Sequence, residues 1–253
     1  MSAPAWPRPQ WHDSGDEAFL LWFVFGDFDP DPRIDAHKYR TRGLPAGIDA
    51  VRYANHALER WDGYPLAGTL GRLLWDEDAR LFERAKAAGD CWMLRGALQD
   101  PPDLDALRDL TGSIAALCDG GGIAVVDPQI LSMFDAMQWS RRHLARDAFV
   151  AREHVLILCD EDESHAGRVR VHTRGMRKFA RPDIDVRNVP PHAANLAGEL
   201  AARFVEFQCA GGLVADGHVV EFDDAPDGLV AHLAGTLDDP AFNNRHLALR
   251  WPD

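Results

Sequence analysis

The sequence has few cysteines, no long apolar run and no periodic glycine or proline, and each shortage excludes a class of protein. Its longest run of large apolar side chains, residues 19–25, has seven residues, whereas a membrane-spanning helix needs roughly 20. The 21 glycines and 16 prolines follow no period, which excludes a collagen-like or low-complexity chain. Four cysteines are too widely spaced for a disulfide scaffold or a zinc motif: Cys91, Cys118, Cys159 and Cys209. We therefore expect a cytoplasmic protein with reduced thiols and no membrane span.

Basic residues are also in short supply. The chain has 27 lysines and arginines against 40 aspartates and glutamates, which gives a formal net charge of -13. This charge repels a phosphate backbone, so we expect no nucleic acid among the partners and favour basic proteins, although the charge could merely keep the protein soluble. Residues 168–187 are an exception, with seven basic and two acidic side chains, whereas residues 206–253 carry nine acidic and two basic ones.

Diagnostic catalytic and metal-binding motifs are absent as well. The eleven histidines include no pair four residues apart that is joined to a glutamate, as zinc proteases have. The glycines at 120–122 precede an expected strand, whereas a phosphate-binding glycine loop follows a strand and opens a helix. The serines lack the flanking glycines of a nucleophile elbow. The sequence therefore assigns no catalytic residue, no metal and no cofactor.

The N-terminal part of the chain divides into an arm and several expected elements. Residues 1–16 contain three prolines and two tryptophans without periodicity, which is typical of an extended arm. Residues 19–25 are aromatic and β-branched without alternation, which predicts a strand covered on both faces. The spacing of apolar residues predicts helices over 48–61 and over 76–88.

One pattern occurs twice, over residues 91–126 and 184–222. In each copy an expected strand is followed by two prolines that open a helix, and a cysteine, one further residue and two glycines end that helix before a second strand. The two copies indicate two related β-α-β units, although both could merely use the commonest start and stop residues. With an added antiparallel hairpin, this predicts an α+β fold with a mixed sheet. Residues 17–253 would form a single domain, or two packed halves that meet near 127–150.

The expected hairpin consists of residues 153–161 and 167–174. Residues 160–163 are acidic, and residues 168–174 alternate strictly between cationic and uncharged side chains. Period-two alternation places the cationic members on one face of the strand: Arg168, Arg170, His172 and Arg174.

This cationic strip has two interpretations. It could bind an anion, with Arg170, His172, Arg174, Arg177 and Lys178 as donors to a carboxylate or phosphate. It could instead pair with the acidic strand, which would neutralise the arginines nearest the turn. Arg174 and His172 would then face apolar residues, so they are the positions that distinguish the two interpretations.

The segment His172–Asp183, which reads HTRGMRKFARPD, resembles the central segment of a bacterial domain family of uncharacterised function. The resemblance covers about fifteen residues of the chain. It implies a bacterial cytoplasmic protein with an α+β fold, and it brings no established reaction or catalytic residue.

Two functions of different classes follow from these observations. The first is a non-catalytic protein that binds another protein and neutralises or regulates a basic partner. The second is an enzyme that acts on an anionic small molecule in a pocket near His172, Arg174 and Lys178. A deep pocket around His172 would favour the enzyme, and a broad exposed acidic or apolar patch would favour the binding protein.

Overall fold

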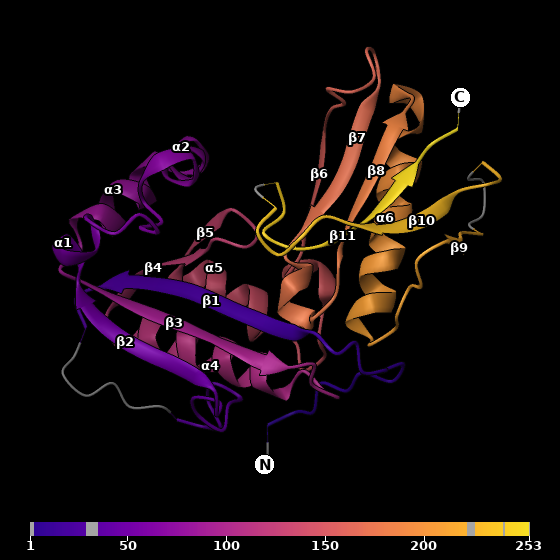
Figure 1. The fold of residues 1–253 in the computed structure, drawn as a ribbon. Coiled ribbons are helices and arrows are strands. Elements are labelled where there is room, and N and C mark those ends of the chain that lie inside the picture. The colour runs from indigo at the N-terminus through magenta and orange to yellow at the C-terminus, as the bar shows by residue number, and fades with distance from the viewer. Residues whose placement is uncertain (1–2, 29–34, 222–225, 240, 253) are drawn as a thin grey trace. The chain divides into compact units, whose positions relative to one another are not determined.

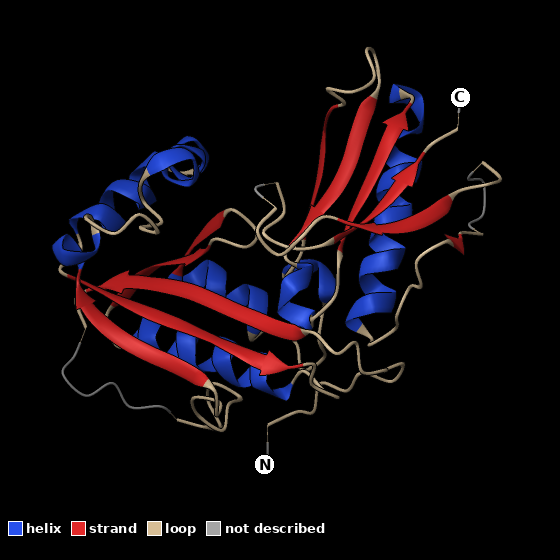
Figure 2. Cartoon of the chain, viewed as in Figure 1, coloured by secondary structure: helices blue, strands red, loops and turns tan. Residues whose placement is uncertain are grey.

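The computed structural model describes residues 3–28, 35–221, 226–239 and 241–252, which contain both helices and strands (Figures 1 and 2). The predicted α+β class is confirmed, with two sheets in place of one. The chain divides into two compact units. Unit 1 comprises Met1–Pro7, Phe19–Leu98 and Asp103–Phe149, and unit 2 comprises Arg8–Ala18, Gln99–Pro102 and Val150–Asp253.

The sheet of unit 1 has five strands in the order β2-β3-β1-β4-β5. They are β1 (Glu17–Gly26), β2 (Ile48–Ala54), β3 (Asp90–Gln99), β4 (Gly122–Asp127) and β5 (Ser132–Asp135). β1 is antiparallel to β4 and runs opposite to β3 (Figure 1). β3 and β4 are therefore parallel, with β1 between them. Helix α4 (Asp105–Asp119) joins these two strands and completes the first predicted β-α-β unit.

Helices cover both faces of this sheet. α2 (Gly68–Glu77) and α3 (Ala79–Ala87) contribute Leu74 and Phe82 to a core that also contains Phe23 and Phe25 of β1. α4 and α5 (Ala136–His143) lie along the other face (Figure 2). Trp22 and Val24, which alternate with those phenylalanines along the strand, are fully buried. β1 is thus covered on both faces, as the run at 19–25 predicts.

The helix predicted over 48–61 is wrong. Its first half is strand β2, which pairs antiparallel with β3, and only α1 (Asn55–Leu58) is helical. The sheet edge supplies backbone partners for β2, and this pairing outweighs the local helical spacing. The helix predicted over 76–88 is broken at Asp78, where α2 ends and the carboxylate accepts a hydrogen bond from the Leu81 amide at 2.9 Å.

The sheet of unit 2 has six strands in the order β6-β7-β8-β11-β10-β9. They are β6 (Leu156–Glu161), β7 (Val169–Arg174), β8 (Asp183–Val189), β9 (His218–Val219), β10 (Val230–Ala234) and β11 (His246–Arg250). Three short 3-10 helices accompany them: η1 (Ala151–Glu153), η2 (Met176–Phe179) and η3 (Pro191–Ala193). β8 and β11 are parallel, and the other neighbours in the sheet are antiparallel.

Helix α6 (Ala194–Cys209) follows β8 and packs on one face of this sheet. Its Leu200 and Phe204 share a core with Val171, Val186 and Leu249. The returning strand of the second predicted β-α-β unit is shorter than expected. Among the described residues 213–221, only the two residues of β9 form a strand. β9 runs parallel to β8, since two antiparallel steps separate it from β11.

The predicted hairpin is confirmed, because β6 and β7 pair antiparallel. In its register, Asp160 lies opposite Arg170, Leu158 opposite His172 and Leu156 opposite Arg174. Arg174 and His172 therefore face apolar residues across the hairpin, as their positions predict.

Residues 3–16 contain no helix and only an isolated bridge from Pro7 to Asp103. Within unit 1, Trp6 is buried, and its amide donates to the Asp105 carboxylate at 2.9 Å. Within unit 2, Arg8 is buried beside Asp100. The arm is thus tied into both units by side chains.

Candidate functional site

The cationic strip lies on the face of β7 that points away from α6. Val171 lies in the core beneath α6, so side chains one position away in the strand point to the opposite face. We call Arg170, His172 and Arg174 the β7 face. The structure brings these three predicted residues together on one strand and surrounds them with groups from β6, β8 and residues 241–246.

A buried carboxylate neutralises Arg170. Arg170 Nε donates to Oδ1 of Asp185 at 2.5 Å, and Arg187 Nε donates to Oδ2 of the same carboxylate at 2.8 Å. Burial raises the pKa of Asp185, but the hydrogen bonds from the two arginines together hold it below its usual range. The partner of Arg170 is therefore on β8, whereas the sequence predicted one among residues 160–163.

His172 contacts the acidic strand. Its Nε2 lies 2.9 Å from Oδ2 of Asp160, whose side chain is exposed. Burial lowers the pKa of His172, and the contact with Asp160 opposes that shift. His172 is therefore mainly neutral near pH 7 and keeps one ring nitrogen in contact with a carboxylate.

An aromatic ring occupies the centre of this face. Phe242 stacks on His246, with ring centroids 4.5 Å apart, and meets His172 edge-on at 5.7 Å. The Arg170 guanidinium lies 5.1 Å from the Phe242 ring centroid. Burial also lowers the pKa of His246. An apolar side chain of the protein itself therefore fills the space between the cationic groups.

Arg174 is buried and donates from Nη1 to the main-chain carbonyl of Ala241. Burial lowers its pKa, and the nearby carboxylates of Asp183 and Asp239 oppose that shift. Asp183 is itself fully buried, and burial raises its pKa to about 6 although Asn244 donates a hydrogen bond to it at 2.8 Å.

The other two predicted anion-binding residues lie on η2 and contact main-chain carbonyls. Arg177 Nη1 donates to the Asn243 carbonyl at 3.1 Å. Lys178 Nζ donates to the His154 carbonyl at 3.0 Å, and only 1% of Lys178 is exposed. Lys178 is therefore held inside unit 2, where a ligand on the β7 face would not reach its ammonium group.

Several nitrogens around the β7 face lack a hydrogen-bond partner among the described side chains and backbone: Arg170 Nη2, His172 Nδ1, Arg174 Nε and His246 Nδ1. Each belongs to a side chain whose other polar atoms contact a carboxylate or a carbonyl. The face thus combines neutralised charges with hydrogen-bonding capacity that the protein does not use.

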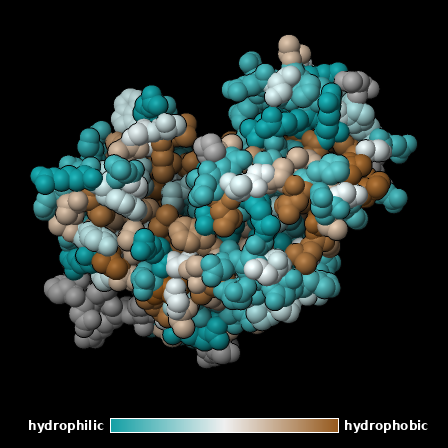
Figure 3. All heavy atoms as spheres, in the orientation of Figure 1, coloured by the Kyte–Doolittle hydropathy of each residue, from teal (hydrophilic) through white to brown (hydrophobic). Residues whose placement is uncertain are grey.

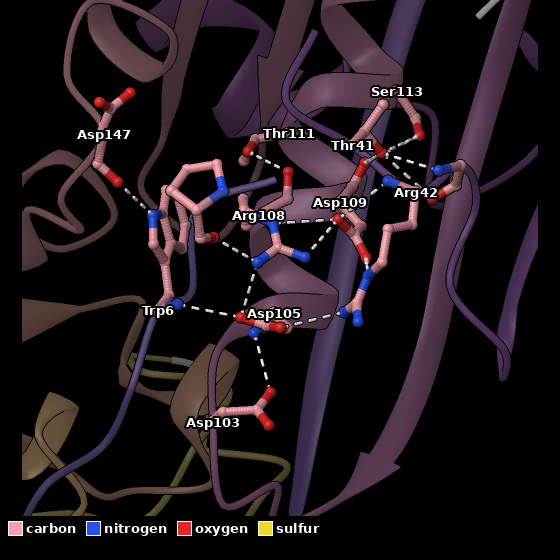
Figure 4. Close-up of polar contacts among 12 residues, drawn as sticks. Trp6, Thr41, Arg42, Asp103, Asp105, Arg108, Asp109, Thr111, Ser113 and Asp147 are labelled. Carbon is pink, nitrogen blue, oxygen red and sulfur yellow. Dashed lines mark hydrogen bonds and ion pairs between the residues drawn. The ribbon is translucent and has the colours of Figure 1, made fainter. Parts of the chain in front are cut away.

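A second polar cluster lies at the start of α4 in unit 1, where Figure 4 shows its side chains converging. Arg108 donates from Nη2 to Asp109 at 2.7 Å and contacts Asp105 at the same distance. Arg42 donates from Nε to the second Asp109 oxygen at 2.8 Å. Asp105 also accepts the Trp6 amide. These contacts fix the arm against α4, and we assign the cluster a structural role.

A third cluster is buried in unit 2, and no pattern in the sequence indicates it. Asp100 accepts from Arg8 Nη1 at 2.7 Å and from Arg181 Nη1 at 2.6 Å, and the three side chains are completely buried. The remaining guanidinium nitrogens donate to main-chain carbonyls, including those of Phe179 and Gly211. The partners are far apart in the chain, so no local pattern could have indicated this cluster.

The cysteines provide no activated thiol among the buried positions. Burial raises the pKa of Cys91 and Cys209, and raises that of Cys118 to about 12. Cys159 is exposed, because β6 forms the edge of its sheet. The three buried thiols are therefore protonated near pH 7.

An apolar hollow of about 220 Å³ lies beside α6 in unit 2. We call this cavity the α6 hollow. Its apolar lining comprises Leu200, Phe204, Phe207, Val214 and Val220. By its spacing Phe207 belongs to the apolar stripe of α6 with Leu200 and Phe204, but 41% of it is exposed.

No family model, curated protein or solved structure matches the chain. Among the described residues, no three histidine, cysteine, aspartate or glutamate side chains are grouped so that they could hold a metal ion. None of the helices in the described ranges is long and apolar enough to cross a membrane. The resemblance of residues 172–183 to a bacterial family stays a prediction.

Proposed function

We propose that this protein is a non-catalytic bacterial cytoplasmic protein that binds another protein, most favourably a basic one. The observation that carries the proposal is the exposure of large apolar side chains around the α6 hollow. Phe207, Leu213 and Val219 are 41%, 43% and 57% exposed. Apolar residues gathered around a hollow mark an interaction surface more often than isolated exposed residues do.

The state of the β7 face supports the same proposal. Carboxylates of the protein contact Arg170 and His172, and a main-chain carbonyl contacts Arg174. Phe242 is only 4% exposed and lies among these groups. An enzyme for anionic substrates needs an accessible cationic pocket, whereas this face is already neutralised and filled by an aromatic ring.

Affinity purification from the source cells tests the proposal, with the full chain, Phe207→Ser and Arg174→Met as baits. We expect the full chain and Arg174→Met to retain the same protein in stoichiometric amount, and Phe207→Ser to lose it. Equal retention by Phe207→Ser would show that the binding surface lies elsewhere. Absence of any stoichiometric partner of the full chain would overturn the proposed function.

The alternative function is an enzyme that acts on an anionic small molecule, and the unused nitrogens of the β7 face favour it. Its donors would be Arg170, His172, Arg174 and Arg177, since the ammonium group of Lys178 is held inside unit 2 and does not reach the β7 face. Calorimetry with phosphate and carboxylate metabolites tests it. Saturable binding that disappears in Arg174→Met, with an unchanged melting temperature, would establish this alternative.

A further inference from the structure

We propose that the α6 hollow receives one bulky apolar side chain from a basic segment of the partner protein. This inference rests on the proposed function and specifies the chemistry of the partner. It depends on the size of the hollow, on its apolar lining and on the charge that surrounds it.

The size of the α6 hollow favours a single side chain over a small-molecule ligand. Its volume of about 220 Å³ is below the range of roughly 300–1,000 Å³ that is usual for small-molecule sites. Aromatic and large aliphatic side chains that insert into such pockets provide most of the binding free energy at protein interfaces.

Part of the lining belongs to the core of unit 2. The Phe207 ring lies against Gly212, where an added Cβ would come within 2.3 Å of the ring. Leu200 and Phe204 are buried in the core beneath the sheet. Figure 3 shows apolar side chains gathered over the end of α6 and over β9. The partner would therefore meet a preformed surface, which reduces the entropy lost on binding.

The charge around the hollow selects a basic partner. Residues 204–244 contain eight acidic side chains and no lysine or arginine. Glu221 lines the hollow. Glu206 and Asp216 are exposed on the segments that flank it, where Arg152 lies 3.8 Å from Glu206 and His232 lies 3.4 Å from Asp216. Arg203 is the one arginine or lysine among the lining residues. Lysines or arginines beside the inserted side chain would be attracted to this rim, and acidic segments would be repelled.

Fluorescence anisotropy with short synthetic peptides tests the inference on the full chain. The probe has one tryptophan between lysines in a glycine and serine background. One control peptide has serine in place of tryptophan, and the other has glutamates in place of the lysines. We expect the probe to bind at least about tenfold more tightly than either control, and its affinity to fall with added salt.

Variants of the protein locate the binding. Phe207→Ser removes part of the apolar lining, and Glu221→Lys reverses a charge at the rim without disturbing a buried group. Both should weaken binding of the probe by about tenfold. Leu73→Ser and Glu163→Lys are matched controls, because both residues are exposed and lie outside α6 and the segment that lines the hollow. Neither control should change the affinity.

Three outcomes would overturn the inference: equal binding of the acidic peptide, equal binding of the peptide without tryptophan, or no effect of Phe207→Ser and Glu221→Lys. A dimer of the full chain that Phe207→Ser dissociates in sedimentation would also overturn it, because a second copy would then occupy the hollow. If the natural partner is still lost from Phe207→Ser while the basic peptide fails to bind, the proposed function holds and only the basic chemistry fails.

Discussion

The β7 face and the α6 hollow belong to the same unit, and they differ in whether their side chains find partners within the protein. On the β7 face, Arg170 and His172 contact carboxylates of the same unit, and Arg174 donates to a carbonyl. Around the α6 hollow, Phe207 and Leu213 remain more than 40% exposed. The cationic residues that stand out in the sequence are internally paired, and the apolar surface that the sequence does not emphasise is left open.

Physical chemistry explains this difference. Moving a guanidinium out of water costs several kcal/mol of solvation free energy. This cost is large compared with the net stability of a folded protein, so a buried guanidinium requires a partner within the fold. An exposed apolar side chain loses only the benefit of burial, about 25 cal/mol per Å². A folded protein therefore tolerates an apolar binding surface more readily than an unpaired buried cation.

The largest expected effect comes from removing the carboxylate that neutralises the β7 face. Asp185→Leu removes the carboxylate that contacts both Arg170 and Arg187, so both guanidinium groups lose this ionic partner. We expect a loss of about 3–5 kcal/mol in the free energy of unfolding, measured by urea denaturation. Asp160→Leu is the control, because Asp160 is exposed and should cost less than about 1 kcal/mol. Equal effects of the two substitutions would show that the β7 face does not depend on its buried carboxylate.

Local patterns in the sequence predicted the elements of the fold well where each pattern had a distinct physical cause. The proline pairs and the glycine pairs mark the two ends of α4 and α6 closely. The alternation at 168–174 predicted both the hairpin and the apolar residues that face His172 and Arg174. Capping and period-two alternation are local properties, so a single sequence suffices to read them.

Long-range partners could not be predicted from the same patterns. Asp185 pairs with Arg170 because β8 lies beside β7, and only the sheet order brings the two together. β2 was mistaken for a helix because an exposed edge strand has no clear alternation. Phe207 fits the apolar stripe of α6, but 41% of it is exposed, because exposure depends on which other segments pack there, and the spacing of α6 residues does not indicate those segments.

Arg174 provides a smaller and more discriminating change. Met fills a similar volume and removes a buried charge, but it leaves the Ala241 carbonyl without its donor. These effects oppose each other, so Arg174→Met should change the free energy of unfolding by about 1 kcal/mol, measured by urea denaturation. Partner retention should be unchanged. If partner retention falls while the melting temperature stays constant, the β7 face contributes to binding and the contrast with the α6 hollow is wrong.

The histidines make the stability of the β7 face depend on pH. Burial lowers the pKa values of His172 and His246 from 6.5, so below that pH the unfolded chain binds more protons than the folded one. The free energy of unfolding should therefore fall as the pH drops from 7 through this window. Asp183, whose pKa burial raises to about 6, works in the opposite direction between pH 6 and its usual 3.8.

His172→Gln removes one of the two histidine contributions. Denaturation curves measured at several pH values should show a shallower loss of stability on acidification than the unchanged protein shows. Asp183→Asn should make that loss steeper, because the group that gains a proton in the folded state is gone. A slope that neither substitution alters would mean that the groups on and beneath the β7 face do not control the acid response.

The smallest change in stability is expected at the α6 hollow, where it separates binding from folding. Leu213 is 43% exposed, so Leu213→Ser should alter the free energy of unfolding by no more than about 0.5 kcal/mol. Leu247 lies fully buried in the core of the same unit, and Leu247→Ala should cost about 2–5 kcal/mol. Urea denaturation measures both, and affinity purification measures partner retention. If this surface binds a partner, Leu213→Ser should lose the partner while its free energy of unfolding stays unchanged. If Leu213→Ser instead destabilises the protein as much as Leu247→Ala does, its exposed side chain serves the fold, and the α6 hollow is not an open binding surface.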